Sequence, residues 1–293
     1  MMPDPAVLAA LVALLSASGF AFSTSLQHRV AGGAPESVHS AVGILQYVVR
    51  RPAWLLGSVI GAVALFMHAV ALKLGAIALV QPLMLTGVVL AVLVRAGLDR
   101  KWPERAEVGA VVVISAALAV FLVVANPRPS TATPDQGLAA VMVVAGVVAA
   151  GLIALAARGV PGPGGRASLL GVAAGTLFGL TGGLLKLIGA SVQSAHLVSS
   201  LLRWPLLAMV LVGVWAIAIN QRAYQIAPLA KSMPVLNVVD VLVAVLFGFV
   251  VFGERPAHGL LALVIQGAAL VCLTYGLRKL AQLEEPETVP VTV

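Results

Sequence analysis

The stretch MPVLNVVDVLVAVLF, residues 233–247, is an almost unbroken apolar run with one carboxylate, Asp240, near its middle. Asn237 lies one helical turn before Asp240 and on the same face. A charged Asp at the centre of a bilayer costs at least about 2.5–3.5 kcal/mol. What Asp240 does therefore depends on whether the rest of the chain is built to span a membrane.

The composition is that of a membrane protein. Of the 293 residues, 60% are hydrophobic and only 10% are charged, and the mean hydropathy is +1.06. A soluble domain carries about 25% charged residues. The charges here are grouped between long apolar runs, as in polytopic α-helical membrane proteins, and the runs lack the two-residue alternation of a β-barrel. The net charge of +7 forms no basic stripe, which argues against nucleic-acid binding.

The cysteine content and the N-terminal sequence also give no indication of a soluble or secreted protein. The single cysteine, Cys272, allows no intrachain disulfide, and no Cys/His metal cluster is present in the sequence. The chain begins MMPDP and becomes basic only after its first apolar run. A secretory signal begins with basic residues, so we interpret this run as a retained first span.

Nine apolar runs are long enough to cross a bilayer, which takes about 20 residues. They cover residues 5–27, 54–72, 75–97, 106–125, 137–157, 168–190, 204–222, 227–252 and 256–277. The segment 36–52 is too short and too charged to span easily, and we expect a surface segment or the remnant of a tenth helix.

Lys and Arg predict the orientation, because they concentrate on the cytoplasmic side. Loops after the first, third, fifth, seventh and ninth spans hold 12 of the 18 basic residues, the opposite side holds 4, and 2 lie within spans. The N-terminus is therefore predicted outside and the C-terminus in the cytoplasm. We expect a plasma (inner) membrane protein, and the Ala/Val-rich chain favours a bacterial one.

The chain also contains an internal repeat. A shift of 152 residues aligns 71–94 with 223–246, so that Pro82 matches Pro234 and His68 matches Asn220. A shift of 158 residues aligns the first span with the sixth. The matched small residues are Ala13, Ala17, Ala21 and Ser25 in the first span and Gly171, Gly175, Gly179 and Gly183 in the sixth.

Spans one to four thus correspond to spans six to nine, and the fifth joins them. One extra crossing inverts the second repeat relative to the first, an arrangement typical of secondary transporters. We predict an all-α membrane protein with a first repeat over 1–125 and a second, inverted repeat over 168–280. Residues 126–167 hold an outer loop, the linking helix and an inner loop, and 281–293 form an acidic tail expected to be disordered.

Three motifs carry a family resemblance: ALKLGAIALVQP at 71–82, FGERP at 252–256, and the small residues of the first and sixth spans, the latter ending near Lys186. Together they resemble the drug/metabolite transporter superfamily and its EamA-type repeats. The nine spans and the outward N-terminus look more like its NIPA-like magnesium-transporter branch. The chain departs from the usual five-helix repeats, because the second helix of each repeat is shortened or missing.

Asp240 is the only acidic residue in the interior of a predicted span, and it must face a partner or a cavity, or be protonated. We expect it, with Asn237 and Gln81, to bind a substrate or ion. If a metal binds, Asp240 is the candidate ligand. The alternative is that Asp240 is a hydrogen-bonded residue that joins two helices.

Pro82 and Pro234 each free a backbone carbonyl four residues earlier and are expected to kink their helices symmetrically. His68 and Asn220 are candidate gate residues at opposite membrane faces, with ordinary helix contacts as the alternative. We expect the ammonium groups of the span residues Lys186 and Lys231 to reach the membrane surface. Glu254 is expected to be solvated at a helix boundary, and the small-residue ladders to bring the two repeats together.

The leading functional hypothesis is a secondary carrier that moves a small organic solute by alternating access, with or against protons that bind at Asp240. The alternatives are a NIPA-like transporter of Mg²⁺ or another divalent cation, as the resemblance implies, and a non-transporting membrane subunit or scaffold. The sequence holds no nucleophile or acid–base cluster and no phosphate loop, so we expect neither an enzyme nor a cofactor. The lipid bilayer is the expected partner, and a homodimer is left open.

Overall fold

The computed structural model describes residues 4–32, 47, 49–100, 102–126, 130, 133–191, 204–227, 229–255 and 259–283. Within these ranges the regular structure is helical: α1 (Pro5–Gly32), α3 (Pro52–Leu74), α4 (Ile77–Met84), α5 (Thr86–Asp99), α6 (Arg105–Ala125), α7 (Gln136–Ala156), the 3₁₀ turn η1 (Ala157–Gly159), α8 (Pro163–Ser191), α10 (Trp204–Ile226), α11 (Leu229–Phe252) and α12 (Leu260–Leu283).

The nine predicted spans are confirmed over these ranges, where nine helical segments are long and apolar enough to cross a membrane. The chain is an all-α, multi-pass membrane protein. Several boundaries differ from the predicted ones by four to six residues: α1 extends to Gly32, α8 begins at Pro163, α10 extends to Ile226, and α12 runs from Leu260 to Leu283. Most of the segment 36–52 and nearly all of the tail 281–293 lie outside the described residues.

The third predicted span, 75–97, is two helices rather than one. Pro82 has no N–H to donate and its ring crowds the preceding turn. The helix tightens behind it, with the Leu85 N–H donating to the Pro82 carbonyl at 3.0 Å. The Thr86 hydroxyl donates to the Leu83 carbonyl at 2.6 Å. As a result α4 ends at Met84 and α5 starts at Thr86.

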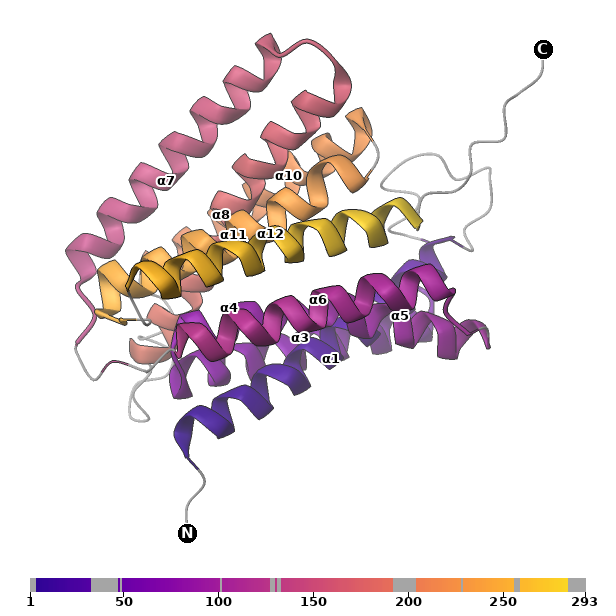
Figure 1. Cartoon of the computed structure of the whole chain (residues 1–293), viewed down its shortest axis with the longest axis horizontal. Coiled ribbons are helices and arrows are strands. Elements are labelled where there is room, and N and C mark those ends of the chain that lie inside the picture. Colours follow the sequence, from indigo (N-terminus) through magenta and orange to yellow (C-terminus); the bar gives the residue numbers. More distant parts are fainter. Residues whose placement is uncertain are drawn as a thin grey trace.

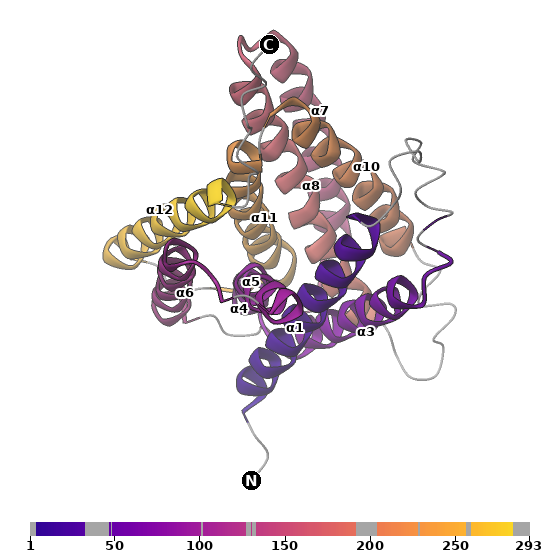
Figure 2. The same cartoon turned by 90° about the vertical axis from the view of Figure 1, so that its right-hand side faces the viewer.

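The two halves of the chain form two adjoining groups of helices (Figure 1). In the first, α1 packs on α3 and α5, and in the second, α8 packs on α10 and α11. The groups meet where α4 contacts α11 and where α6 contacts α12, as both views show for the latter pair (Figure 2). The linking helix α7 packs mainly on α8.

The glycine ladder of α8 packs within the second half, contrary to the expectation that it joins the two repeats. A methyl group at Gly171 or Gly179 would lie 2.6 Å from the carbonyl oxygen of Ser232 or Asp240 on α11. Only glycine lets the two backbones approach this closely. In the first half, a methyl group at Gly87 on α5 would similarly lie 3.3 Å from the Ala17 carbonyl of α1.

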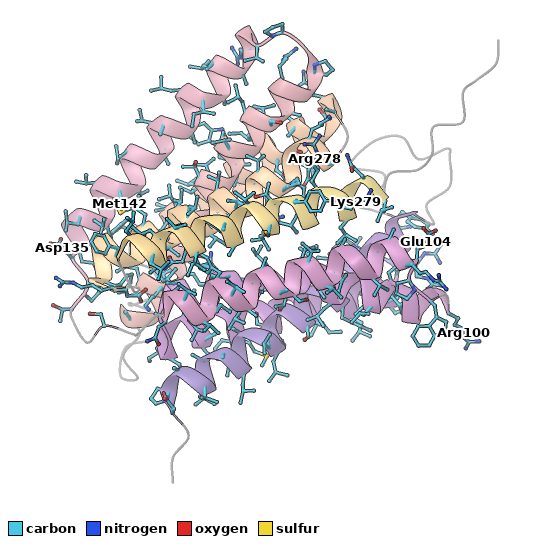
Figure 3. The ribbon with its side chains drawn as sticks, in the orientation of Figure 1. Arg100, Glu104, Asp135, Met142, Arg278 and Lys279 are labelled. Atoms are coloured by element: carbon cyan, nitrogen blue, oxygen red, sulfur yellow. The ribbon has the colours of Figure 1, made fainter. Side chains whose placement is uncertain are left out.

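The outward faces are apolar and the charges gather at the ends of the bundle. Large side chains such as Val59, Phe66, Val123, Val144 and Leu261 are exposed, as lipid-facing residues are. Figure 3 places Arg100, Glu104, Arg278 and Lys279 at one end, and Asp135 at the other. The cations of this first group are among those predicted to face the cytoplasm, so we call these the predicted inner and outer ends.

Candidate functional site

Asp240 lies midway along α11 and is partly exposed. Its Oδ1 accepts a hydrogen bond from Gln81 Nε2 on α4 at 3.4 Å. That distance exceeds the 2.7–3.2 Å of a well-formed hydrogen bond, so the carboxylate is held only weakly. No Lys, Arg or His of the described residues forms an ion pair with Asp240. The carboxylate is thus in the interior of the bundle without a compensating cation.

Gln81 extends the contact to a third helix. Its Oε1 lies 3.1 Å from Nε2 of His68 on α3, and the Gln81 side chain is buried. Because an amide oxygen only accepts, this arrangement requires the hydrogen on His68 Nε2. Gln81 thereby uses its acceptor toward His68 and a donor toward Asp240. We call His68, Gln81 and Asp240 the polar row.

Helix α8 supplies the wall beside the polar row. A methyl group built at Gly182 would lie 3.0 Å from Cδ of Gln81. One turn earlier, Gly179 meets the backbone of α11 at Asp240. The glycines of α8 therefore set both the position of the Gln81 amide and the distance between α8 and α11.

Two asparagine side chains have buried atoms without a hydrogen-bond partner in the described structure, Asn237 Nδ2 and Asn220 Oδ1. Asn237 is one turn from Asp240 on α11, so its amide belongs to the same region. Asn220 is on α10, and no described hydrogen bond joins it to the polar row. The structure thus links His68 to Asp240 through Gln81, whereas no described hydrogen bond joins its repeat counterpart Asn220 to these residues.

The two prolines differ in their surroundings. Helix α4 ends two residues after Pro82, whereas α11 continues as one helix through Pro234. The expected symmetry between them is therefore not found in the helix boundaries. The interruption at Leu85 comes four residues after Gln81, so this amide is in the last turn of a short helix.

A second buried cluster consists of Lys186 on α8, Glu254 just after α11, and the turn Gly75–Ile77 between α3 and α4. Lys186 Nζ pairs with Glu254 Oε1 and also donates to the Gly75 carbonyl at 2.6 Å. Glu254 Oε2 accepts from the Ile77 N–H at 2.8 Å. We call these residues the ion-pair cluster.

The ion-pair cluster overturns two predictions. Lys186 does not reach the membrane surface and Glu254 is not solvated, since the two residues are only 7% and 2% exposed. Each charge instead meets a helix end of favourable polarity, the carboxylate at the start of α4 and the ammonium at the end of α3. Nζ also lies 5.1 Å from the centre of the Phe252 ring. Lys231, in contrast, is exposed, as expected.

The backbone after α11 positions Glu254. Gly253 adopts a left-handed conformation with φ of 66°. The chain then folds back, so that the Glu254 N–H donates to the Gly248 carbonyl at 3.1 Å. A methyl group at Gly248 would lie 2.6 Å from Glu254 Oε2. Gly253 and Gly248 thus allow the Glu254 carboxylate to fold back against the end of α11.

The described side chains offer no ready-made metal centre. Among them, no three His, Cys, Asp or Glu residues lie close enough to hold one ion. Asp240 is the single carboxylate of the polar row, and the second buried acid near α11, Glu254, is already paired with Lys186. A metal ion at Asp240 would therefore keep most of its water ligands.

Sequence reasoning named every member of the polar row but not their contacts, and it missed the ion-pair cluster. One signal was available for the cluster. Lys186 and Glu254 both fall near the ends of spans predicted to run outward, which places opposite charges at a similar depth in the membrane. Their 68-residue separation hid the pair from any local pattern.

Comparison with known proteins adds one relative. An uncharacterized protein from Corynebacterium glutamicum is 25% identical over 249 residues, which cover 85% of this chain and 86% of that protein. No protein-family model matches the chain. No solved structure matches it either. The similarity therefore extends over most of both chains, and the function has to be argued from the geometry of the site.

Proposed function

We propose that this protein is a secondary transporter of the drug/metabolite transporter type, which moves a small organic solute by alternating access with proton binding at Asp240. The observation that carries the proposal is the polar row itself. It joins both halves of the chain inside the membrane, and its carboxylate has no cation partner among the described residues.

Asp240 has the chemistry that coupling requires. A carboxylate held in the membrane interior must bind a proton, a cation or a polar ligand to offset its lost hydration. Its one described side-chain hydrogen bond, from Gln81, is long, so a ligand can replace it at small cost. Protonation and ligand binding then compete for the same oxygen atoms, which is the basis for exchanging one for the other.

Neighbouring groups supply recognition of a polar solute. Asn237 Nδ2 is a buried donor without a described partner. A buried donor without a hydrogen bond costs about 1–3 kcal/mol. A ligand that offers an acceptor to Asn237 Nδ2 would therefore bind more tightly. Gln81 is fixed on one side by His68, which orients its amide. A solute with both a donor and an acceptor fits this set better than an apolar one.

The packing of the helices supports alternating access between two inverted repeats. The contacts α1–α3 and α1–α5 in one half correspond to α8–α10 and α8–α11 in the other. The final helices of the halves, α6 and α12, run side by side in opposite directions (Figure 1). The polar row lies where the halves meet, as substrate sites of inverted-repeat transporters do.

The ion-pair cluster gives this carrier a closed outer side. Lys186 and Glu254 both belong to the second half, and their described hydrogen bonds to the first half go to the backbone of Gly75 and Ile77. Moving the halves apart breaks those two hydrogen bonds but leaves the charges paired with each other. Outward opening therefore avoids an isolated buried charge, whose cost would be several kcal/mol.

The test is a ligand screen on purified protein in detergent. The melting temperature of wild-type protein and of Asp240→Asn is measured with a panel of organic amines, amino acids and sugars, and with Mg²⁺. A ligand that binds only folded protein raises the melting temperature by mass action. An organic solute whose shift disappears in Asp240→Asn, and which wild-type proteoliposomes then accumulate under a pH gradient, supports the proposal.

A Mg²⁺ shift that disappears in Asp240→Asn, with none from the organic panel, favours the divalent-cation alternative. If uptake of the solute keeps its full pH dependence in Asp240→Asn, the coupling role of Asp240 is wrong.

A further inference from the structure

A separate pocket of about 580 Å³ lies between α7, α8 and α10, and it opens to the surface on one side. Its lining includes three arginines, Arg158, Arg166 and Arg222, together with Trp215. The remaining lining residues are small or aliphatic, and none belongs to the polar row or the ion-pair cluster. The arginines come from η1, the start of α8 and the end of α10, which lie at the predicted inner end.

The positive charge of this pocket is not balanced by the helices that form it. Between Asp135 and Asp240 the sequence contains no acidic residue at all, so α7, α8 and α10 carry none. No described acidic side chain pairs with the three arginines. Arg222 Nη1 makes one neutral contact, to Gln225 Oε1 at 3.2 Å.

A fourth cation lies next to the pocket. The side chain of Lys231 passes across the start of α8, where a methyl group at Gly164 would lie 3.6 Å from its Cδ. The Ser168 hydroxyl donates to the Lys231 carbonyl at 2.8 Å and fixes the start of α11 on α8. The field at this end of the three helices therefore strongly favours an anion.

The apolar walls of the pocket distinguish it from a simple anion site. They are continuous with the exposed faces of α7 and α10, which carry Leu152 and Leu155 on one side and Leu211 and Val214 on the other. The Trp215 ring lies against α7, where a methyl group at Gly151 would be in van der Waals contact with the indole at 3.4 Å. Trp215 is itself 38% exposed and lies about midway along α10, at the depth of lipid acyl chains.

We propose that this pocket binds the phosphate headgroup of an anionic phospholipid from the cytoplasmic leaflet, with an acyl chain lying between α7 and α10. Arginine matches phosphate geometry by paired N–H donors, and basic pockets between membrane helices recognise acidic lipid headgroups in this way. The site is distinct from the polar row, since none of its lining residues belongs to it. It ties the linking helix α7 to α10 of the second half through a lipid.

Trp215 provides a direct probe. Purified protein in neutral detergent is titrated with phosphatidylglycerol carrying brominated acyl chains, and quenching of tryptophan fluorescence is recorded. Phosphatidylcholine with the same brominated chains is the lipid control, and Trp215→Phe identifies the part of the signal from this site. The variants are Arg166→Gln/Arg222→Gln, Arg166→Lys/Arg222→Lys, and the matched control Arg255→Gln at the predicted outer end.

We expect phosphatidylglycerol to quench Trp215 at lower concentration than phosphatidylcholine. The double Gln variant should weaken this binding about tenfold or more, since each basic residue near an anionic surface is worth about 1 kcal/mol. The double Lys variant should retain part of the affinity and Arg255→Gln all of it. Both double variants replace the same two arginines, but only the Lys variant keeps the positive charges. Stronger binding by the Lys variant than by the Gln variant would therefore show that the loss comes from the missing charge and not from misfolding.

Three results would overturn the proposal. Equal quenching by the two lipids would show a nonselective apolar groove. Unchanged affinity in the double Gln variant would remove the arginines from the site. Full displacement of phosphatidylglycerol by inorganic phosphate, but not by chloride at the same ionic strength, would assign the pocket to a free anion.

Discussion

The polar row and the ion-pair cluster each include a residue of α4, Gln81 and Ile77, four residues apart, yet their electrostatics are opposite. Gln81 lies about 6 Å of helix rise deeper than Ile77. In the ion-pair cluster both charges are paired and each also meets a backbone group. In the polar row the carboxylate has one long hydrogen bond and no cation among the described residues.

This difference indicates that the Lys186–Glu254 pair stabilises the fold, whereas Asp240 is available to bind a proton or a ligand. A satisfied buried pair gains nothing from a ligand, whereas an uncompensated carboxylate is stabilised by any proton or ligand that reaches it. Removing a charge should therefore be damaging in the ion-pair cluster and tolerated in the polar row. The following predictions use that contrast, from the largest expected effect to the smallest.

The largest effect is expected for Lys186→Met. It leaves the buried Glu254 carboxylate without its cation, and breaking a buried pair in this way costs about 3–5 kcal/mol. The free energy of unfolding in mixed micelles, titrated with a denaturing detergent, measures the loss. Lys186→Met/Glu254→Gln removes both charges and should recover a large part of it. A single variant as stable as wild type would contradict the account of this cluster.

A smaller loss, about 1–3 kcal/mol, is expected for Gly248→Ala. The added methyl group would lie 2.6 Å from Glu254 Oε2 and would push the carboxylate away from the Ile77 N–H. Gly267→Ala on α12 is the matched control, because nothing lies within 4 Å of a methyl group there. Similar unfolding curves for the two variants would show that the position of the Glu254 carboxylate does not require the absence of a side chain at Gly248.

Gly182→Ala should act on the polar row. Its methyl group would displace the Gln81 amide, since Cδ of Gln81 would lie only 3.0 Å away. We expect about 1 kcal/mol or less of lost stability, because a flexible amide can move, but a clear loss of solute binding. The melting-temperature shift with a bound solute measures it, with Gly109→Ala, which also has no neighbour within 4 Å, as the control.

The smallest effect on stability is expected for Asp240→Asn. The change removes an uncompensated charge from the membrane interior and keeps the shape, so the free energy of unfolding should stay within about 1 kcal/mol of wild type or rise. The same unfolding titration used for Lys186→Met measures it. A loss as large as that of Lys186→Met would mean that Asp240 is a structural residue joining helices.

The helices and the members of the polar row were predictable from the sequence, because both depend on local features. Apolar runs of about 20 residues fix the spans, and Asp240 is conspicuous as a carboxylate inside one. The alignment of the two halves also drew attention to His68 and Pro82. None of this required knowledge of which helices are neighbours.

The remaining features depend on tertiary contacts. Lys186 was expected to reach the surface because its partner, Glu254, follows a different helix. The glycine ladder was expected between the repeats, but it packs α8 on α11, because spacing along one helix does not identify the partner helix. The helix break after Pro82 has no counterpart at Pro234, so a proline shared by the two repeats does not by itself predict where a helix is interrupted.

The central claim is that Asp240 takes up and releases the coupling proton, and it can be tested before any solute is known. Proteoliposomes are adsorbed on a solid-supported membrane, and the charge displaced by a rapid pH jump is recorded for wild type, Asp240→Asn and Asp135→Asn. Asp135 caps α7 outside the membrane span, where asparagine caps equally well. The account predicts a transient displacement in wild type and Asp135→Asn that is absent from Asp240→Asn. An unchanged displacement in Asp240→Asn would contradict it.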